Sequence, residues 1–277
     1  MRREQNITTS LTKMKTLNFI TTAILAVITG ANLASCSNDD DDNNKPDSKI
    51  IVNPAKVFKE GIPSRVGSMS ITCNADGLVT KISDDDEVVN FSYTSGSRAS
   101  DYDVVMSTQE FDMYITLNKS GFASHCKEVM ADGETEEWWF EYNSDGQLNK
   151  MRRTEGDNET TDISYSGGDI ASVKVRNNDN DEDDNIINYG NSPIENKGCI
   201  MLFDETFGID MDEMIYAYYA GMLGTATKSL PVSYSYTSYE SGITDTGIES
   251  FEWALNASGL PTSLVMRPSN EKLNFTW

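Results

Sequence analysis

Carboxylates at alternate positions are the first residues of this sequence whose spacing could support chemistry. Asp179, Asp181 and Asp183 occupy the first, third and fifth positions of a calcium-loop pattern, in which alternate carboxylates converge on one hard cation. The pattern then fails, because Asp184 stands at the sixth position in place of Gly and Gly190 at the twelfth in place of Glu. The three aspartates are the candidate metal ligands, and a solvated hairpin tip is the alternative that the mismatches favour.

The sequence offers little for nucleophilic or phosphate chemistry. It contains no Gly-rich phosphate loop and no Gly-x-Ser-x-Gly elbow, and His125 is its only histidine, which excludes a His-Glu-x-x-His metal motif. A Ser-His-Asp triad could use only His125, and nothing places a partner on each side of it. Two carboxylates about 5 to 9 Å apart could hydrolyse a glycosidic bond. With 44 acidic residues in the chain, such a pair cannot be identified from the sequence. We assign no catalytic residue and expect no cofactor.

An aromatic strand is the better indication of binding. Side chains alternate along a strand, so Trp138, Phe140 and Tyr142 share one face while Trp139 and Glu141 share the other. If the first set is core, Trp139 lies on the polar face, where an exposed indole beside a carboxylate suits a sugar ring or an aromatic peptide. Trp139 and Glu141 are therefore the candidate ligand-binding residues. Coverage of the tryptophan by a neighbouring loop, or an inward position in a curved sheet, is the alternative.

The cysteine at position 36 is the candidate for covalent lipidation. Lys13 and Lys15 precede an apolar stretch at 17–34, which Thr and Asn interrupt and which is short for a transmembrane helix. The stretch ends in the lipobox-like run Leu33-Ala34-Ser35-Cys36. We predict a signal peptide over residues 1–35, starting at Met1 or Met14, and a diacylglyceryl anchor on Cys36. An uncleaved anchor or an ordinary secretory signal is the alternative.

Composition limits the partners of the chain. Residues 1–35 hold four of the 22 basic and one of the 44 acidic residues, so the remainder carries 18 − 43 = −25. Nucleic acid and anionic membrane surfaces are poor partners for that charge. We therefore expect contact with the membrane through the lipid anchor only, and a monomer. Residues 36–48, which begin with a run of Asp and Asn, form a predicted disordered acidic tether.

The other three cysteines are Cys73, Cys126 and Cys199. An odd number leaves at least one free thiol, and any single pairing among the three is open in an oxidising compartment. Cys73 and Cys199 each lie in an apolar alternation, which is typical of a buried small hydrophobe. We predict no essential disulfide.

Alternating runs joined by Gly-containing turns continue from residue 49 to the end of the chain. Turns of one kind recur at Gly77, Gly146 and Gly259, separated by 69 and then 113 residues, so the repeats lack the fixed period of a solenoid. We predict an all-β antiparallel meander of a dozen or more strands, curled into a barrel or strongly curved sheet because closure removes exposed edges. It forms a single domain over residues 49–277.

One segment breaks the two-residue rhythm. Apolar residues follow helical spacing from Met211 to Met222, with the N-cap type Asp210 before them and Gly224 after. This predicts one amphipathic helix over about 210–223, packed on the sheet or covering one of its openings.

Four short runs together suggest a family. Residues Tyr189–Gly198, Tyr218–Gly221, Gly259–Pro261 and Phe275–Trp277 resemble an uncharacterised family of Bacteroidetes lipoproteins, a domain of unknown function with a porin-like fold. The acidic run after Cys36 resembles the export signal of surface lipoproteins of the same bacteria. The resemblance implies a barrel-like sheet and an outer-membrane lipoprotein facing the cell surface, with a periplasm-facing lipoprotein as the alternative. It implies no activity.

The sheet is not predicted to span the membrane. Spanning needs a lipid-facing apolar band on every strand, whereas the faces opposite the aromatic ones carry residues such as Thr72, Glu141 and Glu252. The function that these features favour is a lipid-anchored envelope protein that binds a glycan or peptide or serves as an accessory. A carboxylate-based glycan hydrolase and a structural partner of an outer-membrane complex are the alternatives.

Overall fold

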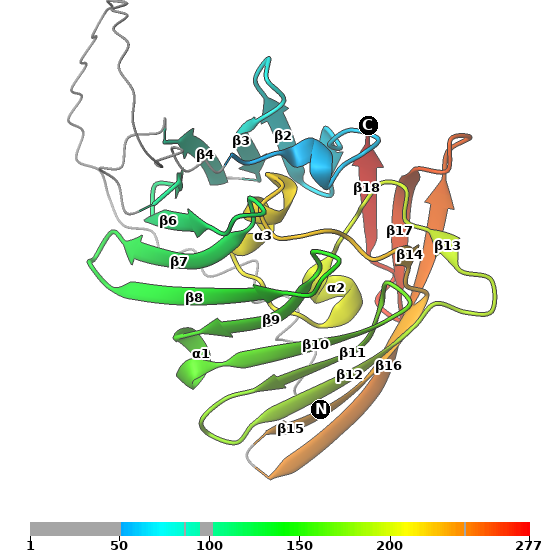
Figure 1. The fold of residues 1–277 in the computed structure, drawn as a ribbon. Helices are drawn as coiled ribbons and strands as arrows, with labels where there is room; N and C mark the ends of the chain where they lie inside the picture. The colour runs from blue at the N-terminus through cyan, green and yellow to red at the C-terminus, as the bar shows by residue number, and fades with distance from the viewer. Residues whose placement is uncertain (1–50, 86, 95–101, 241) are drawn as a thin grey trace, which may run out of the picture. The chain divides into compact units, whose positions relative to one another are not determined.

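The alternating strands of the sequence form a closed antiparallel barrel (Figure 1). The computed structural model describes residues 51–85, 87–94, 102–240 and 242–277, so the predicted signal peptide, Cys36 and the acidic tether lie outside the described residues. Within the described ranges, sixteen strands follow one another around the barrel, and β1 pairs with β18 to close it. The predicted meander curled into a barrel is confirmed.

Each barrel strand pairs with antiparallel neighbours on both sides, so the wall is one continuous ladder. The strands are β1 (Arg65–Val66), β2 (Met69–Cys73), β3 (Val79–Asp84), β4 (Glu87–Tyr93), β5 (Val104–Ser107), β6 (Phe111–Leu117), β7 (Ala123–Met130), β8 (Thr135–Tyr142), β9 (Leu148–Arg153), β10 (Thr160–Ser166), β11 (Asp169–Arg176), β12 (Glu182–Asn188), β15 (Ser233–Glu240), β16 (Ile243–Leu255), β17 (Pro261–Arg267) and β18 (Lys272–Thr276). A separate two-stranded sheet pairs β13 (Ile194–Glu195) with β14 (Ser229–Leu230).

A recurring asparagine turn connects many of the hairpins. At the end of β2, Asn74 Oδ1 accepts hydrogen bonds from the backbone N–H groups of Asp76 and Leu78, both 3.0 Å, and Gly77 adopts a φ of 79°. An asparagine side chain that bonds the backbone two residues on mimics a turn, and Gly accepts the left-handed φ without strain. The same pair of bonds is made by Asn118, Asn143, Asn177 and Asn256.

The barrel interior is filled by the chain between β13 and β14. We call residues 199–223 the internal segment; it contains α2 (Phe203–Phe207) and α3 (Met214–Tyr219), drawn in yellow among the strands in Figure 1. Most of its side chains are buried and belong to the same hydrophobic cluster as the inward-facing side chains of the strands. Tyr218 and Tyr219 are 0% exposed, which places them at the centre of that cluster. The interior is therefore a packed core.

The predicted helix over 210–223 is present but shorter. It is limited to α3, because Asp212 adopts a left-handed φ of 39° before it and Gly221 a φ of 83° after it. A Cβ on Gly221 would lie 2.7 Å from Pro54 Cα, so this end packs tightly against the 3₁₀-helix η1 (Pro54–Lys56). The remaining helices are α2 and α1 (Glu155–Asn158), and no helix among the described residues is long and apolar enough to cross a membrane.

The three cysteines of the barrel lie in different environments. Cys126 is buried in β7, Cys73 is exposed at the end of β2 and Cys199 is half-buried at the start of the internal segment. All three are free thiols in the structure. Burial raises the pKa of each thiol, and most strongly that of Cys126, which favours the protonated form.

Candidate functional site

The aspartates with calcium-loop spacing lie at the turn between β11 and β12. Asp179 is in the turn, Asp181 just precedes β12, and Asp183 is an exposed residue of that strand. Asn177 Oδ1 accepts hydrogen bonds from the backbone N–H groups of Asp179 and Asp181, each 3.0 Å, so the spacing belongs to one of the recurring asparagine turns. Across the described ranges, no group of three or more His, Cys, Asp or Glu side chains has an arrangement that could hold a metal ion.

Trp139 lies on the outward face of β8, opposite the buried Trp138. It stands between His125 of β7 and Arg152 of β9, its register partners. The Arg152 guanidinium carbon lies 4.5 Å from the centroid of the indole ring, and the His125 ring centroid lies 5.4 Å away. His125 Nε2 is also 3.0 Å from Glu137 Oε2. Because Arg152 covers a face of the indole, a sugar ring could stack there only after displacing it.

Glu141 begins a row of alternating charges around the outer wall. The side chains on neighbouring strands in this row, in register order, are Glu141, Lys150, Asp162, Lys174 and Asp184. Lys150 Nζ lies 3.5 Å from Asp162 Oδ1, and Lys174 Nζ lies 3.2 Å from Asp184 Oδ1. Opposite charges on directly paired strands stabilise one another. The outer wall between β8 and β12 is therefore strongly polar.

A shallow groove lies at the end of this row, across β12 and β15. It has a volume of about 290 Å³ and is lined by Asn180, Glu182, Asp184, Thr237 and Tyr239. The register pairs Glu182 with Tyr239 and Asp184 with Thr237, so two cross-strand pairs form its floor. Tyr239 is 45% exposed, a high value for a large aromatic side chain.

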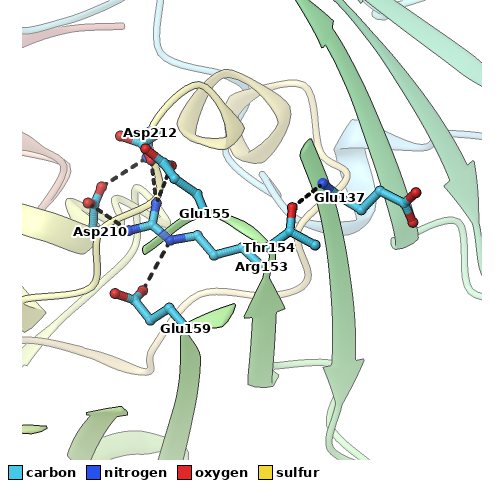
Figure 2. A network of polar contacts seen from close by, with 7 residues as sticks. All are labelled: Glu137, Arg153, Thr154, Glu155, Glu159, Asp210 and Asp212. Carbon is cyan, nitrogen blue, oxygen red and sulfur yellow. Dashed lines mark hydrogen bonds and ion pairs between the residues drawn. The ribbon is translucent and has the colours of Figure 1, made fainter. Parts of the chain in front are cut away.

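A second cluster of charges surrounds Arg153 at the end of β9, where the arginine is buried and its carboxylate partners are partly exposed (Figure 2). The Arg153 side chain is only 6% exposed, and carboxylates of the described chain surround its guanidinium. Its Nη2 lies 3.0 Å from Asp210 Oδ2, its Nε lies 3.1 Å from Glu159 Oε1, and its Nη1 contacts both Glu155, at 3.3 Å, and Asp212. Figure 2 shows the four carboxylates converging on the guanidinium.

The Arg153 cluster joins the barrel wall to the internal segment. Asp210 and Asp212 belong to the connection between α2 and α3, whereas Arg153 and Trp138 belong to the wall. The guanidinium carbon of Arg153 also lies 5.2 Å from the centroid of the Trp138 ring, which holds it against an apolar surface. The backbone N–H of Glu137 donates to the Thr154 hydroxyl, 3.0 Å, and fixes the adjoining strand end (Figure 2).

The acids around Arg153 outnumber it, and their pKa values reflect this. Burial, with repulsion from Glu213 next, raises the pKa of Glu128 to about 8, and burial raises that of Glu213 to about 7. Burial also raises the pKa values of Asp212 and Glu159, although Arg153 opposes both shifts. Burial acts to lower the pKa of Arg153, but Asp210 and the other carboxylates raise it above its ordinary value. The guanidinium therefore stays charged while some of its acidic neighbours hold protons near neutral pH.

Two further polar contacts fasten the internal segment. The Asn185 side chain of β12 donates from Nδ2 to the carbonyls of Phe207, 3.1 Å, and Gly208, 3.3 Å. The Tyr216 hydroxyl of α3 donates to Glu87 Oε2 of β4, 2.8 Å. Together with Arg153, these contacts hold the segment to the wall at β4, β9 and β12.

Sequence reasoning missed the Arg153 cluster. A signal was present, because Arg153 is two residues after Met151 and so shares the inward face of β9 with it. An arginine on a core-facing position requires buried carboxylate partners. The helical spacing of the apolar residues that follow predicts instead that its partners Asp210 and Asp212 lie at the start of a helix.

The described residues form a closed antiparallel barrel with a filled interior. Residues 64–263 match the model of the domain of unknown function DUF4595, with porin-like fold, and the chain belongs to this family. No curated protein matches the chain.

Solved structures with a similar fold include two from Bacteroides. A porin-like protein from Bacteroides uniformis is 19% identical, with a TM-score of 0.55, over 75% of this chain and 89% of that one. A porin-like protein from Bacteroides vulgatus is 12% identical, also with a TM-score of 0.55, over 78% of this chain and 98% of that one. The family description assigns no activity, and neither the family nor these structures favours the hydrolase alternative.

Proposed function

We propose that the protein is a lipid-anchored accessory protein of the bacterial cell envelope, whose filled barrel stands in water and binds through its outer wall. The observation that carries the proposal is the row of alternating charges from Glu141 to Asp184. A membrane-spanning barrel presents an apolar band to lipid, and charges at the bilayer midplane cost roughly 2–4 kcal/mol each. Such a wall is therefore suited to an aqueous environment.

The packed interior gives the proposal its second support. A channel needs a polar lumen, whereas the inward faces here contact the buried aromatic and methionine side chains of the internal segment. Binding of a ligand in a cavity inside the barrel is correspondingly disfavoured. The barrel is better suited as a rigid support that presents its exterior and its loops to a partner.

The membrane association that we propose depends on Cys36. The lipobox and the acidic run after it support a location at the outer membrane, facing the cell surface. Attachment is through the lipid only, the protein is a monomer, and its net charge disfavours nucleic acid.

Surface proteolysis of intact cells tests this proposal. The wild type should fractionate with membranes and be cleaved by added protease, whereas the Cys36→Ala variant should be recovered without detergent as folded β protein by circular dichroism. If the wild type fractionates with membranes but resists the protease, the protein faces the periplasm and the surface assignment is wrong. If the variant still requires detergent, the barrel itself contacts lipid and the water-exposed wall is wrong.

A further inference from the structure

We propose that the groove lined by Asn180, Glu182, Asp184, Thr237 and Tyr239 binds one sugar residue of a neutral glycan. The inference deepens the proposed function and rests on it in one respect, since it requires the outer wall to be in water. The groove lies on that wall, on two strands whose backbones are fully paired within the barrel.

The groove has the size and shape for a single sugar ring. Residues two apart on a strand are separated by about 7 Å, and neighbouring strands by about 4.8 Å. Glu182 and Asp184 therefore mark out one edge and Tyr239 and Thr237 the facing edge of a patch close to the footprint of a pyranose. Asn180, at a left-handed φ of 65°, closes the end of the patch next to Tyr239 and Glu182.

The chemistry of the lining matches that of a sugar. The exposed ring of Tyr239 offers an apolar face for the C–H side of a pyranose and a hydroxyl at its edge. Carboxylates accept hydrogen bonds from sugar hydroxyls, and the Thr237 hydroxyl and Asn180 amide can both donate and accept. Neighbouring hydroxyls of a sugar present this mixture of donors and acceptors.

Lys174 holds the two carboxylates in position. Its Nζ lies 2.7 Å from Glu182 Oε1 and 3.2 Å from Asp184 Oδ1, from the side of β11. Each carboxylate retains a second oxygen that can accept from a hydroxyl. A hydrogen bond from Lys174 lowers the pKa of Glu182, so the carboxylate remains an ionised acceptor across the physiological range. Groups fixed in advance lose less side-chain entropy when a ligand binds.

The same lysine argues against a cationic ligand. Its ammonium already neutralises part of the charge of Glu182 and Asp184, and the register places Arg176 opposite Glu182 as well. A positively charged peptide would therefore gain little from the groove and would compete with Lys174. A peptide added as an extra strand is also disfavoured, because β12 and β15 pair with each other and each pairs with a further strand on its other side.

Affinity electrophoresis of the purified Cys36→Ala protein tests the inference. The native gels contain soluble xylan, mannan, dextran or starch as neutral probes, or polygalacturonate as an acidic one. We expect retardation by at least one neutral polysaccharide, an affinity on the order of tenfold weaker for Tyr239→Ala, and a clear loss for Glu182→Gln. Ile243→Ala removes an exposed side chain of the same hairpin that does not line the groove, and should bind as the parent does.

The outcomes separate the inference from the proposed function. Absence of retardation by all four neutral polysaccharides overturns the inference, as does retardation that Tyr239→Ala leaves unchanged. Binding of oligolysine in place of the polysaccharides, measured by calorimetry, would assign the groove to cationic peptides. None of these results depends on which side of the membrane the protein faces, so a periplasmic location leaves this test interpretable, whereas a Cys36→Ala variant that requires detergent overturns both proposals.

Discussion

The guanidinium of Arg153, on the barrel wall, contacts the carboxylate of Asp212, on the internal segment. The contact brings together a strand end and a segment 59 positions later in the chain. Three more carboxylates share the same guanidinium. The single positive charge of Arg153 therefore holds the internal segment to the barrel wall, although the carboxylates around it outnumber it.

Removal of this cation should destabilise the fold strongly. The Arg153→Leu substitution leaves Asp212, Glu159 and the half-exposed Asp210 without a counter-charge. Loss of one partner of a buried ion pair costs about 3–5 kcal/mol, and solvent at the exposed carboxylates brings the expected loss to the lower end of this range. Urea unfolding at pH 7 should show a loss of about 3 kcal/mol in the free energy of unfolding. The neighbouring Arg152→Leu, on the outer wall, is the control and should cost about 1 kcal/mol or less. Equal losses for the two variants would contradict the interior role.

The free energy of unfolding should fall as pH rises from about 5 to 8. The folded-state pKa is about 8 for Glu128 and about 7 for Glu213, both above the ordinary value of 4.5. Carboxyls with raised pKa values favour the folded state fully below their unfolded pKa, and this contribution is lost as pH rises through the folded pKa. The groups that face one another here are Glu128, Glu136, Arg153, Glu155, Glu159, Asp210, Asp212 and Glu213.

Urea midpoints measured at intervals between pH 5 and pH 8 check this dependence. Glu128→Gln should flatten the dependence and be more stable than the wild type at pH 8, because the substitution removes a buried group that must ionise. Glu141→Gln, an exposed carboxylate of the outer wall, should leave the slope unchanged. A stability that rises with pH over this range would show that the cluster is ionised and fully paired.

Gly208 tests the packing of the internal segment against β12. It has a φ of 62°, and a Cβ there would lie 2.5 Å from Asn185 Nδ2, which is bonded to the carbonyls of Phe207 and Gly208. Gly208→Ala should cost about 3 kcal/mol in thermal or urea unfolding, from the left-handed backbone and the displaced amide together. Gly133→Ala, at a φ of 91° with open space around it, should cost only about 1 kcal/mol. Similar losses would mean that the amide moves freely.

Adjacent tryptophans on β8 should differ sharply in their contribution to stability. Trp138 is 0% exposed, so Trp138→Ala leaves a large cavity and should cost about 3–5 kcal/mol. Trp139→Ala removes a ring of the outer wall that stacks with Arg152 and should cost about 1 kcal/mol. Differential scanning calorimetry of the two variants checks the contrast. A larger loss for Trp139→Ala would reverse the assignment of the two faces.

The hairpins could be predicted from sequence because their causes are local. Asn74 and Gly77 are sufficient to specify their turn, because the Asn74 side-chain amide bonds the backbone and Gly77 accepts a positive φ. Alternation likewise separates Trp138 and Trp139 onto opposite faces, because the period of a strand depends only on its neighbours in sequence. Fold class and face assignment follow from such short-range rules.

The interior and the groove depend on long-range pairing, and sequence alone did not provide it. Tyr216 contacts Glu87 across 129 positions, and no local pattern relates the two. The groove likewise needs the register of β12 with β15, which brings Glu182 opposite Tyr239 across 57 positions. The predicted helix over 210–223 is longer than α3. Apolar residues with helical spacing continue past α3 because they pack in the core, although the backbone is no longer helical at Gly221.

The closing seam of the barrel has a consequence for how the chain folds and opens. Strand β1 contains only two residues, and it joins Val66 to Phe275 and Arg65 to Thr276. Contacts so far apart in sequence form late, because the entropy of closing the loop is lost before they stabilise anything. The seam is thus the ladder that should form last and exchange its amide protons first. Whenever it opens, the edges of β1 and β18 become available to a second molecule, and strand exchange at this position is the route by which the protein would aggregate.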